Sequence, residues 1–531
     1  MNVRRYQKWA KSGLAILLAG AMMVGTAASG GGMTAQAAET ESSDTVSTQK
    51  AVTSDAASLL FTEKHITSDL TLPTIGASGT TISWKSSNPS VLSNEGKVTR
   101  PKKGAADEEV TLKGTVKMGD YAKARNFTFV VLAESEMGPT KEFALDQVEL
   151  LDDYYLTAQN SDIEFLKKFD NDRLLSRFRE TAGLDTKKIA PYGGWEDGWL
   201  GGHSVGHYLT AIAQAVKATG NADLKEKSKQ LIEGLAECQN KLGTGFIFGA
   251  KIETEGYVEK QFDILEGKTT GKTWVPWYNM HKMLTGLVDT YKYTGNKQAL
   301  EVAKKLGDWI YNRVSKWDAG TQGRVLGTEY GGMNDCLYEL YLCTRDSKHL
   351  EAAHKFDQPN LYKTVAKGGK NCLNGKHANT TIPKFLGALK RYVVLEQTGE
   401  LTKDDEAYLT NVEKFFDIAV TRHAYITGGV SVMEHFRKDN NQDGTRTQTN
   451  CESCCAHNML KMAKELYKVT GDKKYADYYE TTLRNSIMGA VKSESGAAAY
   501  FIPMATGYFK TFGNEDPAKN MFWCCTGSGM E

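Results

Sequence analysis

The sequence predicts a mainly α-helical protein, an (α/α)6 toroid preceded by a small all-β domain. A helix-ending turn recurs at Thr219-Gly220-Asn221, Thr294-Gly295-Asn296, Thr344-Arg345-Asp346, Thr398-Gly399-Glu400 and Thr470-Gly471-Asp472. The helices that enter these turns carry one apolar face, as with Val205, Leu209, Ile212 and Val216. Each of them also begins in a polar stretch that contains Gly, His or Cys. Repeated helical hairpins with polar starts predict a closed ring whose helix N-termini converge on one mouth.

The N-terminal 38 residues are expected to be a signal peptide. Basic residues at Arg4, Arg5, Lys8 and Lys11 precede an apolar run over 14–24, and Ala35-Gln36-Ala37 supplies a small-x-small cleavage site. The apolar run is shorter than the roughly 20 residues that a membrane span needs, so export is favoured over anchoring. We therefore expect a secreted or cell-surface bacterial protein with no membrane span after cleavage.

Residues 39–55 are rich in Ser, Thr, Glu and Ala and predict a linker. Residues 56–135 predict short strands, at 81–84, from 109 and at 126–131, separated by the turns Asn88-Pro89 and Asn94-Glu95-Gly96. The run SWKSSNPSVLSNEGKVTRP resembles bacterial immunoglobulin-like modules of secreted carbohydrate enzymes. Such a module is expected to act as a spacer or weak binder.

The toroid is expected over residues 141–531. The segments that open its inner helices are GGHSVGHYL (201–209), VPWYNMHKML (275–284), YGGMNDCLYEL (330–340), HANTTIPKFL (377–386) and CESCCAHNML (451–460). A sixth, FWCCTGSGME, begins at Phe522, so the last hairpin is expected to be truncated. The formal net charge of +1 favours neither a nucleic-acid groove nor an anionic membrane surface as partner.

Nine cysteines in an exported chain would ordinarily indicate disulfides. The number is odd, however, and adjacent cysteines such as Cys524 and Cys525 rarely pair with each other because the disulfide geometry strains the peptide between them. Glu452, Cys454, Cys524 and Cys525 together offer one carboxylate and three thiols, a tetrahedral ligand set for Zn²⁺. Buried cysteines that act as small hydrophobes are the alternative, and that is the interpretation for Cys238, Cys336, Cys343 and Cys372.

Seven segments resemble the β-L-arabinofuranosidase family of glycoside hydrolases (families 127 and 146). They are YGGWE (192–196), GHSVGHYLTA (202–211), GGMN (331–334), HANTTIPK (377–384), TGGVSVMEHF (427–436), CESC (451–454) and FWCCTGSGME (522–531), in the family's order. The resemblance implies an (α/α)6 barrel normally followed by β-sandwich domains, which are expected to be missing here.

The resemblance also implies roles for individual residues. Zinc is expected on Glu452, Cys454, Cys524 and Cys525, with Cys524 as the nucleophile. Glu434 matches the family's general acid/base, and together they imply a retaining mechanism through a thioglycosyl intermediate. The implied substrate is a plant-type oligosaccharide or polysaccharide with β-linked L-arabinofuranose. A thiolate would then replace the carboxylate nucleophile of most glycosidases.

Four residues are expected to contact the sugar. His281 and His377, both placed at the start of an inner helix, are candidates for holding hydroxyl groups. Trp195 and Tyr500 are candidates for stacking and for contact with the glycone, and either could equally belong to the core. After Glu452-Ser453-Cys454 the family tends to have Asn-Thr-Tyr, where this chain has Cys455-Ala456-His457, so Cys455 is an extra thiol beside the expected metal.

Two other functions remain open from the sequence. A non-catalytic carbohydrate-binding or structural protein on the same scaffold would fit the immunoglobulin-like module. A polysaccharide lyase or uronyl hydrolase would fit the toroid, but such enzymes need Tyr/His/Arg sets or paired aspartates and have no thiolate cluster.

Overall fold

The computed structural model describes residues 43–61, 64–67, 69–102, 105–133, 140–250, 257–512 and 521–531. The predicted signal peptide, 1–38, lies outside them. The described residues divide into two units. The smaller one contains 43–60, 73–83 and 114–125, and the larger one contains the remainder. In these described ranges no helix has both the length and the apolar character that crossing a bilayer requires.

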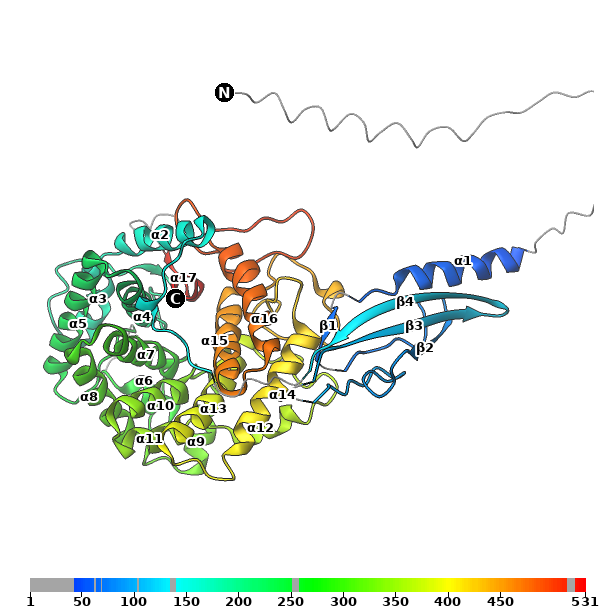
Figure 1. Ribbon diagram of the computed structural model, residues 1–531. Coiled ribbons are helices and arrows are strands. Elements are labelled where there is room, and N and C mark those ends of the chain that lie inside the picture. Colours follow the sequence, from blue (N-terminus) through cyan, green and yellow to red (C-terminus); the bar gives the residue numbers. More distant parts are fainter. Residues whose placement is uncertain are drawn as a thin grey trace, which may run out of the picture. The chain divides into compact units, whose positions relative to one another are not determined.

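A four-stranded sheet forms the N-terminal β region (Figure 1). Its strands are β1 (His65–Ile66), β2 (Thr81–Ser86), β3 (Glu108–Met118) and β4 (Tyr121–Val131), in the order β1-β4-β3-β2. The short β1 runs parallel to β4, with Ile66 opposite Val131. Alternate residues of β3, among them Val110, Leu112 and Val116, are buried, as expected of a sheet with one face in the core. The predicted strands are therefore confirmed.

The stretch that precedes this sheet differs from the prediction. Residues 39–55 predict a linker, whereas helix α1 spans Ser43–Ser58. Val52 and Ala56 are fully buried, so the helix has an apolar side that the overall polar composition conceals. The Asp55 carboxylate also accepts hydrogen bonds from the Ser78 main-chain N–H (3.0 Å) and the Thr80 hydroxyl (2.8 Å). These contacts tie the helix to a loop that lies more than twenty residues further along the chain.

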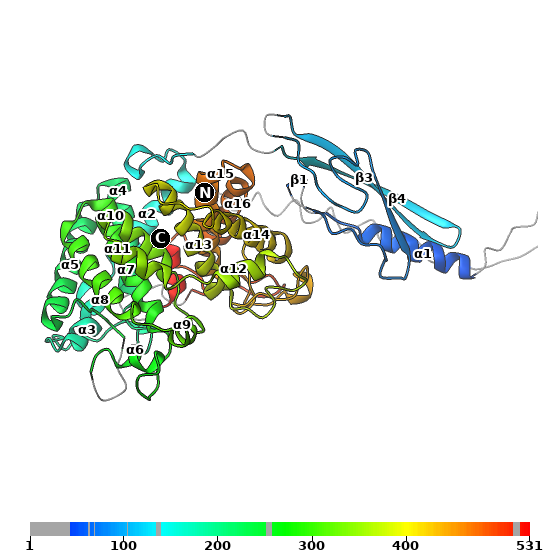
Figure 2. The ribbon, with the colours of Figure 1, turned by 90° about the horizontal axis from the view of Figure 1, so that it is seen from below.

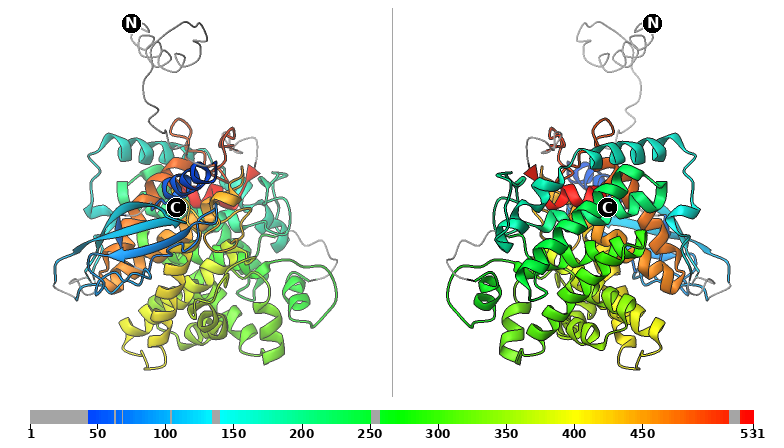
Figure 3. Two further views of the ribbon diagram at one scale, coloured as in Figure 1. Left: turned by 90° about the vertical axis from the view of Figure 1, so that its right-hand side faces the viewer. Right: turned by 90° about the vertical axis from the view of Figure 1, so that its left-hand side faces the viewer.

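Six inner helices form a closed ring in the C-terminal region (Figures 1 and 2). They are α4 (His203–Thr219), α7 (Pro276–Thr294), α10 (Met333–Thr344), α13 (Ala378–Thr398), α15 (Ser453–Thr470) and α17 (Cys524–Met530). Each contacts the next, and α17 closes the ring between α15 and α4 (Figure 3). This arrangement confirms the predicted toroid.

Outer helices pair with the first five inner ones as hairpins. These are α5 (Ala222–Leu242), α8 (Lys297–Val314), α11 (Ser347–His354), α14 (Glu406–His423) and α16 (Lys473–Thr482). The remaining helices are α2 (Asp153–Lys167), α3 (Asn171–Ala182), α6 (Lys260–Leu265), α9 (Ala319–Leu326) and α12 (Pro359–Ala366). The described residues also contain three 3-10 helices, η1 (Leu145–Gln147), η2 (Asp443–Thr445) and η4 (Met488–Ala490), and one π-helix, η3 (Leu483–Ile487). Two short strands, β5 (Gly193–Gly194) and β6 (Met521–Phe522), lie in the same region.

The recurring turn sequence fixes where the inner helices end. The residue after each of the first five has a left-handed conformation, with φ between 55° and 75°, at Gly220, Gly295, Arg345, Gly399 and Gly471. Glycine takes this conformation without steric cost. In four of the turns the next residue then caps the outer helix, because the side chains of Asn221, Asn296, Asp346 and Asp472 accept main-chain N–H groups.

Candidate active site

The mouth of the ring collects the N-termini of the inner helices, and two of them carry the predicted cysteine clusters. Glu452 is the residue before α15, and Cys454 lies in its first turn. Cys524 and Cys525 open α17. Strand β6 pairs in parallel with β5, which holds the start of α17 against the chain before α4. Ring closure therefore unites two segments that are seventy residues apart in the sequence.

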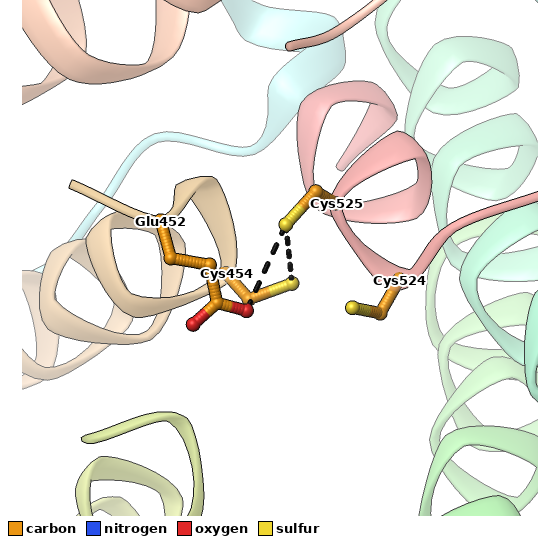
Figure 4. A group of neighbouring side chains, drawn as sticks. All are labelled: Glu452, Cys454, Cys524 and Cys525. Atoms are coloured by element: carbon orange, nitrogen blue, oxygen red, sulfur yellow. Dashed lines mark hydrogen bonds between the residues drawn. The ribbon is translucent and has the colours of Figure 1, made fainter. Parts of the chain in front are cut away.

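Glu452, Cys454, Cys524 and Cys525 converge in one buried cluster (Figure 4). Their ligand atoms all lie within 4.8 Å of one another. The Sγ atoms of Cys454 and Cys525 are 3.3 Å apart, and Cys525 Sγ lies 3.7 Å from Glu452 Oε1. The geometry thus joins the four residues that the sequence selects as metal ligands.

The chemistry of this cluster fits a divalent cation. Burial raises the pKa of Glu452, Cys454 and Cys525, and neighbouring negative groups raise it further. Hydrogen bonds from Cys454 and Cys525 hold the pKa of Cys524 well below its usual range. Four acidic groups in a buried space repel one another when ionised, and a soft cation that prefers thiolates removes that repulsion.

Neighbouring side chains fix the orientation of the cluster. The Asn379 amide donates to Glu452 Oε1 (3.1 Å), and the Ser528 hydroxyl donates to Cys454 Sγ (3.2 Å). Cys455, the additional thiol, lies outside the four-residue set and donates to Glu452 Oε2 (3.0 Å). Such supporting hydrogen bonds orient metal ligands in other proteins.

Glu434 lies in a loop whose backbone is locally strained. Ser431, Met433 and Glu434 have φ values of 89°, 46° and 63°, in the region that side chains other than glycine rarely adopt. Main-chain hydrogen bonds hold the loop, from Ala378 N to Glu434 O (2.6 Å) and from Met433 N to Thr449 O (2.8 Å). These hydrogen bonds offset the cost of the strained backbone. The backbone conformation that they hold sets the direction of the Glu434 carboxyl.

That carboxyl connects to the cysteine cluster through Tyr500. The Tyr500 hydroxyl donates to Glu434 Oε1 and lies 3.7 Å from Cys524 Sγ. His377 Nε2 lies 3.1 Å from the second oxygen, Oε2. The structure therefore joins four of the predicted site residues, Cys524, Tyr500, Glu434 and His377, in one chain of contacts.

His377 caps helix α13. Its Nδ1 accepts the main-chain N–H of Thr380 (3.1 Å), which leaves Nε2 to carry the ring proton and donate to Glu434. Burial disfavours the charged imidazole, but the hydrogen bond to Glu434 and the negative charges of Glu329, Glu434 and Cys524 outweigh it and raise the pKa of His377.

The two other predicted sugar contacts are placed differently. Trp195 packs against the cysteine cluster and forms an edge contact with Trp523 at 5.3 Å between ring centroids. His281 is not at the helix start, because Pro276 begins α7 and the fixed φ of proline suits a first helical turn. It is buried inside α7, and its Nδ1 accepts the Gly332 N–H (3.0 Å).

Three residues of the mouth escape prediction from the sequence. Buried His203 pairs with Glu196 (2.7 Å), and its pKa is raised because the charges of Glu196 and Cys524 outweigh the effect of burial. Glu329 lies just before α10, and its pKa is raised by burial and by the charges of Cys524 and Glu434. His203 and Glu196 lie in the motifs quoted above. They pair across a loop, however, so their spacing in the sequence does not indicate the contact.

The toroid with a cysteine–carboxylate cluster at its mouth corresponds to a glycoside hydrolase catalytic domain. The sequence profile of the β-L-arabinofuranosidase GH127 catalytic domain matches residues 147–531, more than half of the chain. The chain belongs to this family, whose members act on carbohydrates. Residues 46–134 match the atrophied bacterial Ig domain, which confirms the immunoglobulin-like module and includes most of helix α1.

Solved structures share the fold. The GH127 β-arabinofuranosidase BT3674 superposes with a TM-score of 0.52 at 18% identity, over 74% of this chain and 60% of that one. Ara127N-Se, a GH127 β-L-arabinofuranosidase from Geobacillus stearothermophilus T6, gives 0.51 at 16% identity, over 72% and 64%. The chain thus spans less than two thirds of the length of these relatives. No curated protein matches the sequence.

Proposed function

We propose that this protein is a retaining glycoside hydrolase that releases β-linked L-arabinofuranose from plant-type glycans. Residues 141–531 form its catalytic domain, the immunoglobulin-like module is a spacer or weak binder, and the protein acts outside the cell or at its surface. The observation that carries the proposal is the contact chain at the mouth, where Tyr500 links a candidate acid, Glu434, to a candidate sulfur nucleophile, Cys524.

Glu452, Cys454, Cys524 and Cys525 would hold one Zn²⁺. The bound ion supplies positive charge that keeps a thiolate ionised at neutral pH. The donor set supports zinc over calcium or magnesium, because those ions prefer oxygen ligands.

The residues of the chain divide the reaction into two steps. Cys524 Sγ attacks the anomeric carbon while Glu434 protonates the departing glycosidic oxygen, which forms a thioglycosyl bond. Glu434, now ionised, then takes a proton from water, and the resulting attack on the same carbon breaks the carbon–sulfur bond. Two inversions leave the configuration retained. Tyr500 and His377 hold both oxygens of Glu434 in place through these steps.

Two measurements on the full chain test this proposal. Arabinofuranosyl disaccharides of each anomer are incubated with the protein, and zinc per chain is measured by elemental mass spectrometry. We expect one zinc per chain and release of arabinose from the β-anomer. Cys454→Ser should lower the zinc content. Binding of the glycans without turnover, in protein that contains zinc, would indicate the carbohydrate-binding alternative.

A further inference from the structure

A second group of metal-ligating side chains lies between two outer helices, and the proposed mechanism does not use it. Asp308 belongs to helix α8, Asp346 is the residue before helix α11, and His349 lies in the first turn of α11. Their ligand atoms, two carboxylate oxygens and one imidazole nitrogen, all lie within 4.8 Å of one another. Asp346 follows the C-terminal end of inner helix α10, so the group is at the opposite end of the ring from the cysteine cluster.

His349 is 1% exposed, and its contacts determine which ring nitrogen carries the proton. The Thr344 hydroxyl donates to the main-chain oxygen of Leu340 (2.9 Å), so the hydroxyl oxygen is left to accept the proton on His349 Nδ1, 2.8 Å away. A neutral imidazole that is protonated at Nδ1 has a lone pair on Nε2. These contacts therefore select the tautomer that binds a metal ion through Nε2.

That second nitrogen, Nε2, is buried and has no hydrogen-bond partner among the described residues. It faces helix α8 at a position without a side chain, because a Cβ added at Gly307 would lie 2.6 Å from it. The next residue of α8 is Asp308, whose Oδ1 lies 3.9 Å from Nε2, beyond hydrogen-bond distance. A buried lone pair that faces a carboxylate with no proton between them costs free energy, and a cation bound by both groups removes that cost.

Lys348 is the positively charged group beside the two carboxylates. Its Nζ lies 3.4 Å from Asp308 Oδ1 and 3.9 Å from Asp346 Oδ2, and its side chain is 48% exposed. One ammonium group balances only one carboxylate. Burial also keeps the imidazole neutral, because it lowers the pKa of His349 against the effects of the two carboxylates and of the Lys304 main chain. One negative charge therefore remains, and the exposed lysine side chain can rotate into solvent when a cation enters.

We propose that Asp308, Asp346 and His349 bind a second divalent cation of the zinc type, which joins helices α8 and α11. Imidazole nitrogen combined with carboxylate oxygen suits Zn²⁺, whereas Ca²⁺ and Mg²⁺ prefer oxygen ligands alone. Bonds of about 2.0–2.2 Å to zinc require ligand atoms at most about 4.4 Å apart, so small rotations of the two partly exposed carboxylates complete the site. This inference is independent of the proposed function.

The two ligands from α11 are oriented by the fold itself. Asp346 caps the helix, because its Oδ1 accepts the Lys348 main-chain N–H (3.0 Å), which leaves Oδ2 to bind the cation. His349 is held through Nδ1 by Thr344, as metal-bound histidines are commonly held through their second nitrogen. Asp308 comes from the neighbouring hairpin, so only the folded ring unites all three ligands. The cation should therefore stabilise the fold.

This site should bind zinc more weakly than the cysteine cluster. It has no thiolate, and its two carboxylates are partly exposed to water, whereas three thiols and a carboxylate of the cluster are buried. Protein dialysed without added metal should therefore keep one zinc per chain. A second zinc should enter when free Zn²⁺ reaches the micromolar range, on the order of 10 µM.

The test is equilibrium dialysis of the full chain against defined free Zn²⁺, with zinc per chain measured by elemental mass spectrometry. We expect the wild type to gain one further zinc and its midpoint of thermal unfolding to rise as the second zinc binds. Asp308→Asn and His349→Gln should each weaken this second binding by about tenfold or more, while the zinc that dialysis does not remove stays bound. Lys348→Gln should strengthen it, because the competing ammonium group is gone.

Two further variants separate the site from general effects of charge and folding. Glu301→Gln is the matched control, because Glu301 is an exposed carboxylate of the same helix α8 whose partner is Lys304 (3.6 Å), so the same charge is removed elsewhere. Asp346→Asn keeps the helix cap, since asparagine caps as well as aspartate, and any loss of the second zinc there reports the carboxylate alone.

No second zinc at about 100 µM free Zn²⁺ would overturn the site. So would a second zinc that binds equally well to wild type, Asp308→Asn, Asp346→Asn and His349→Gln. The proposed function fails in a different way, as absence of arabinose release by the wild-type chain, and that result leaves the measured zinc binding unchanged.

Discussion

Glu434 is the residue on which the proposed chemistry depends most directly. Its φ of 63° is uncommon for a residue with a side chain. Both carboxyl oxygens have a partner, Tyr500 on one and His377 on the other. A strained backbone and two hydrogen bonds restrict the carboxyl to one orientation, as an acid/base group requires.

The effect of replacing this carboxyl on activity should depend on the leaving group of the substrate. We expect Glu434→Gln to lower kcat/KM on an arabinofuranosyl disaccharide by about 10²–10⁴-fold. The first step on a p-nitrophenyl L-arabinofuranoside should be spared, because p-nitrophenolate departs without a proton. Pre-steady-state release of p-nitrophenol measures that step. An equal loss with both substrates would assign another role to Glu434.

The site could be predicted from the sequence where its residues are clustered in the chain. The candidate metal ligands form two local pairs, Glu452 with Cys454 and Cys524 with Cys525. Closure of the helical ring brings these two pairs together. Glu329 could not be predicted, because the charges that raise its pKa together with burial, those of Cys524 and Glu434, come from distant parts of the sequence. The sequence predicts His281 at a helix start, whereas α7 begins at Pro276, five residues earlier.

Helices α4 and α7 pack closely against each other in the ring. A Cβ added at Gly206 of α4 would lie 2.0 Å from the carbonyl oxygen of Lys282 in α7. One added at Gly286 of α7 would lie 2.5 Å from the carbonyl oxygen of Gly206. The two backbones therefore meet where both helices lack a side chain, and this approach positions the first two segments of the mouth.

A methyl group at this contact should separate the two helices. We expect Gly206→Ala to lower the free energy of unfolding by about 1–3 kcal/mol or more, because backbone atoms must move. Gly323→Ala is the matched control. Gly323 lies in helix α9 with no atom within 4 Å of the added Cβ, so alanine there should be neutral or stabilise by about 0.5–1 kcal/mol. Urea unfolding measures both, and equal values would refute the close-packing argument.

At the level of elements the helical periodicity and the turn sequences predict the structure well. The inner helices end at the predicted turns, even at Arg345, where a non-glycine residue takes the left-handed conformation. Helix α1 was not predicted, because Val52 and Ala56 are two small residues in a polar stretch. Their burial depends on contacts with residues beyond the segment itself.

At the scale of the whole molecule, buried charges in the ring interior link stability to pH. Lys390 of α13 lies 2.6 Å from Glu339 of α10 and 3.5 Å from Glu465 of α15. Burial opposes ionisation of Glu465, but Lys390 and Lys468 outweigh it and lower the pKa of Glu465 from 4.5 to about 2. These charges tie three inner helices together.

The sign of the pH effect follows from that lowered pKa. Glu465 stabilises the fold above the pKa of its unfolded form, about 4.5, and this contribution is lost as pH falls towards about 2. We expect Glu465→Gln to cost at most about 3 kcal/mol at pH 7 and progressively less below pH 4.5. Denaturant unfolding of both proteins at pH 7 and pH 3 measures the difference. A difference that is the same at both pH values would contradict the ion-pair account.

Cys455 offers an internal control for the proposed metal site. It donates to Glu452 Oε2 (3.0 Å) but lies outside the four-residue cluster. Cys455→Ser keeps a donor at this position and should leave the zinc content nearly unchanged, in contrast to Cys454→Ser.

The central claim is that Cys524 bonds to the sugar while Cys454 and Cys525 do not. All three thiols border the same cluster, so loss of activity on mutation does not distinguish them. Reaction with an electrophilic L-arabinofuranose mimic, followed by peptide mass spectrometry, measures the bond itself. The account predicts an adduct on Cys524 at neutral pH, with Cys454, Cys525 and Cys455 unmodified. An adduct on Cys525 or Cys455, or no adduct on any cysteine, would contradict it.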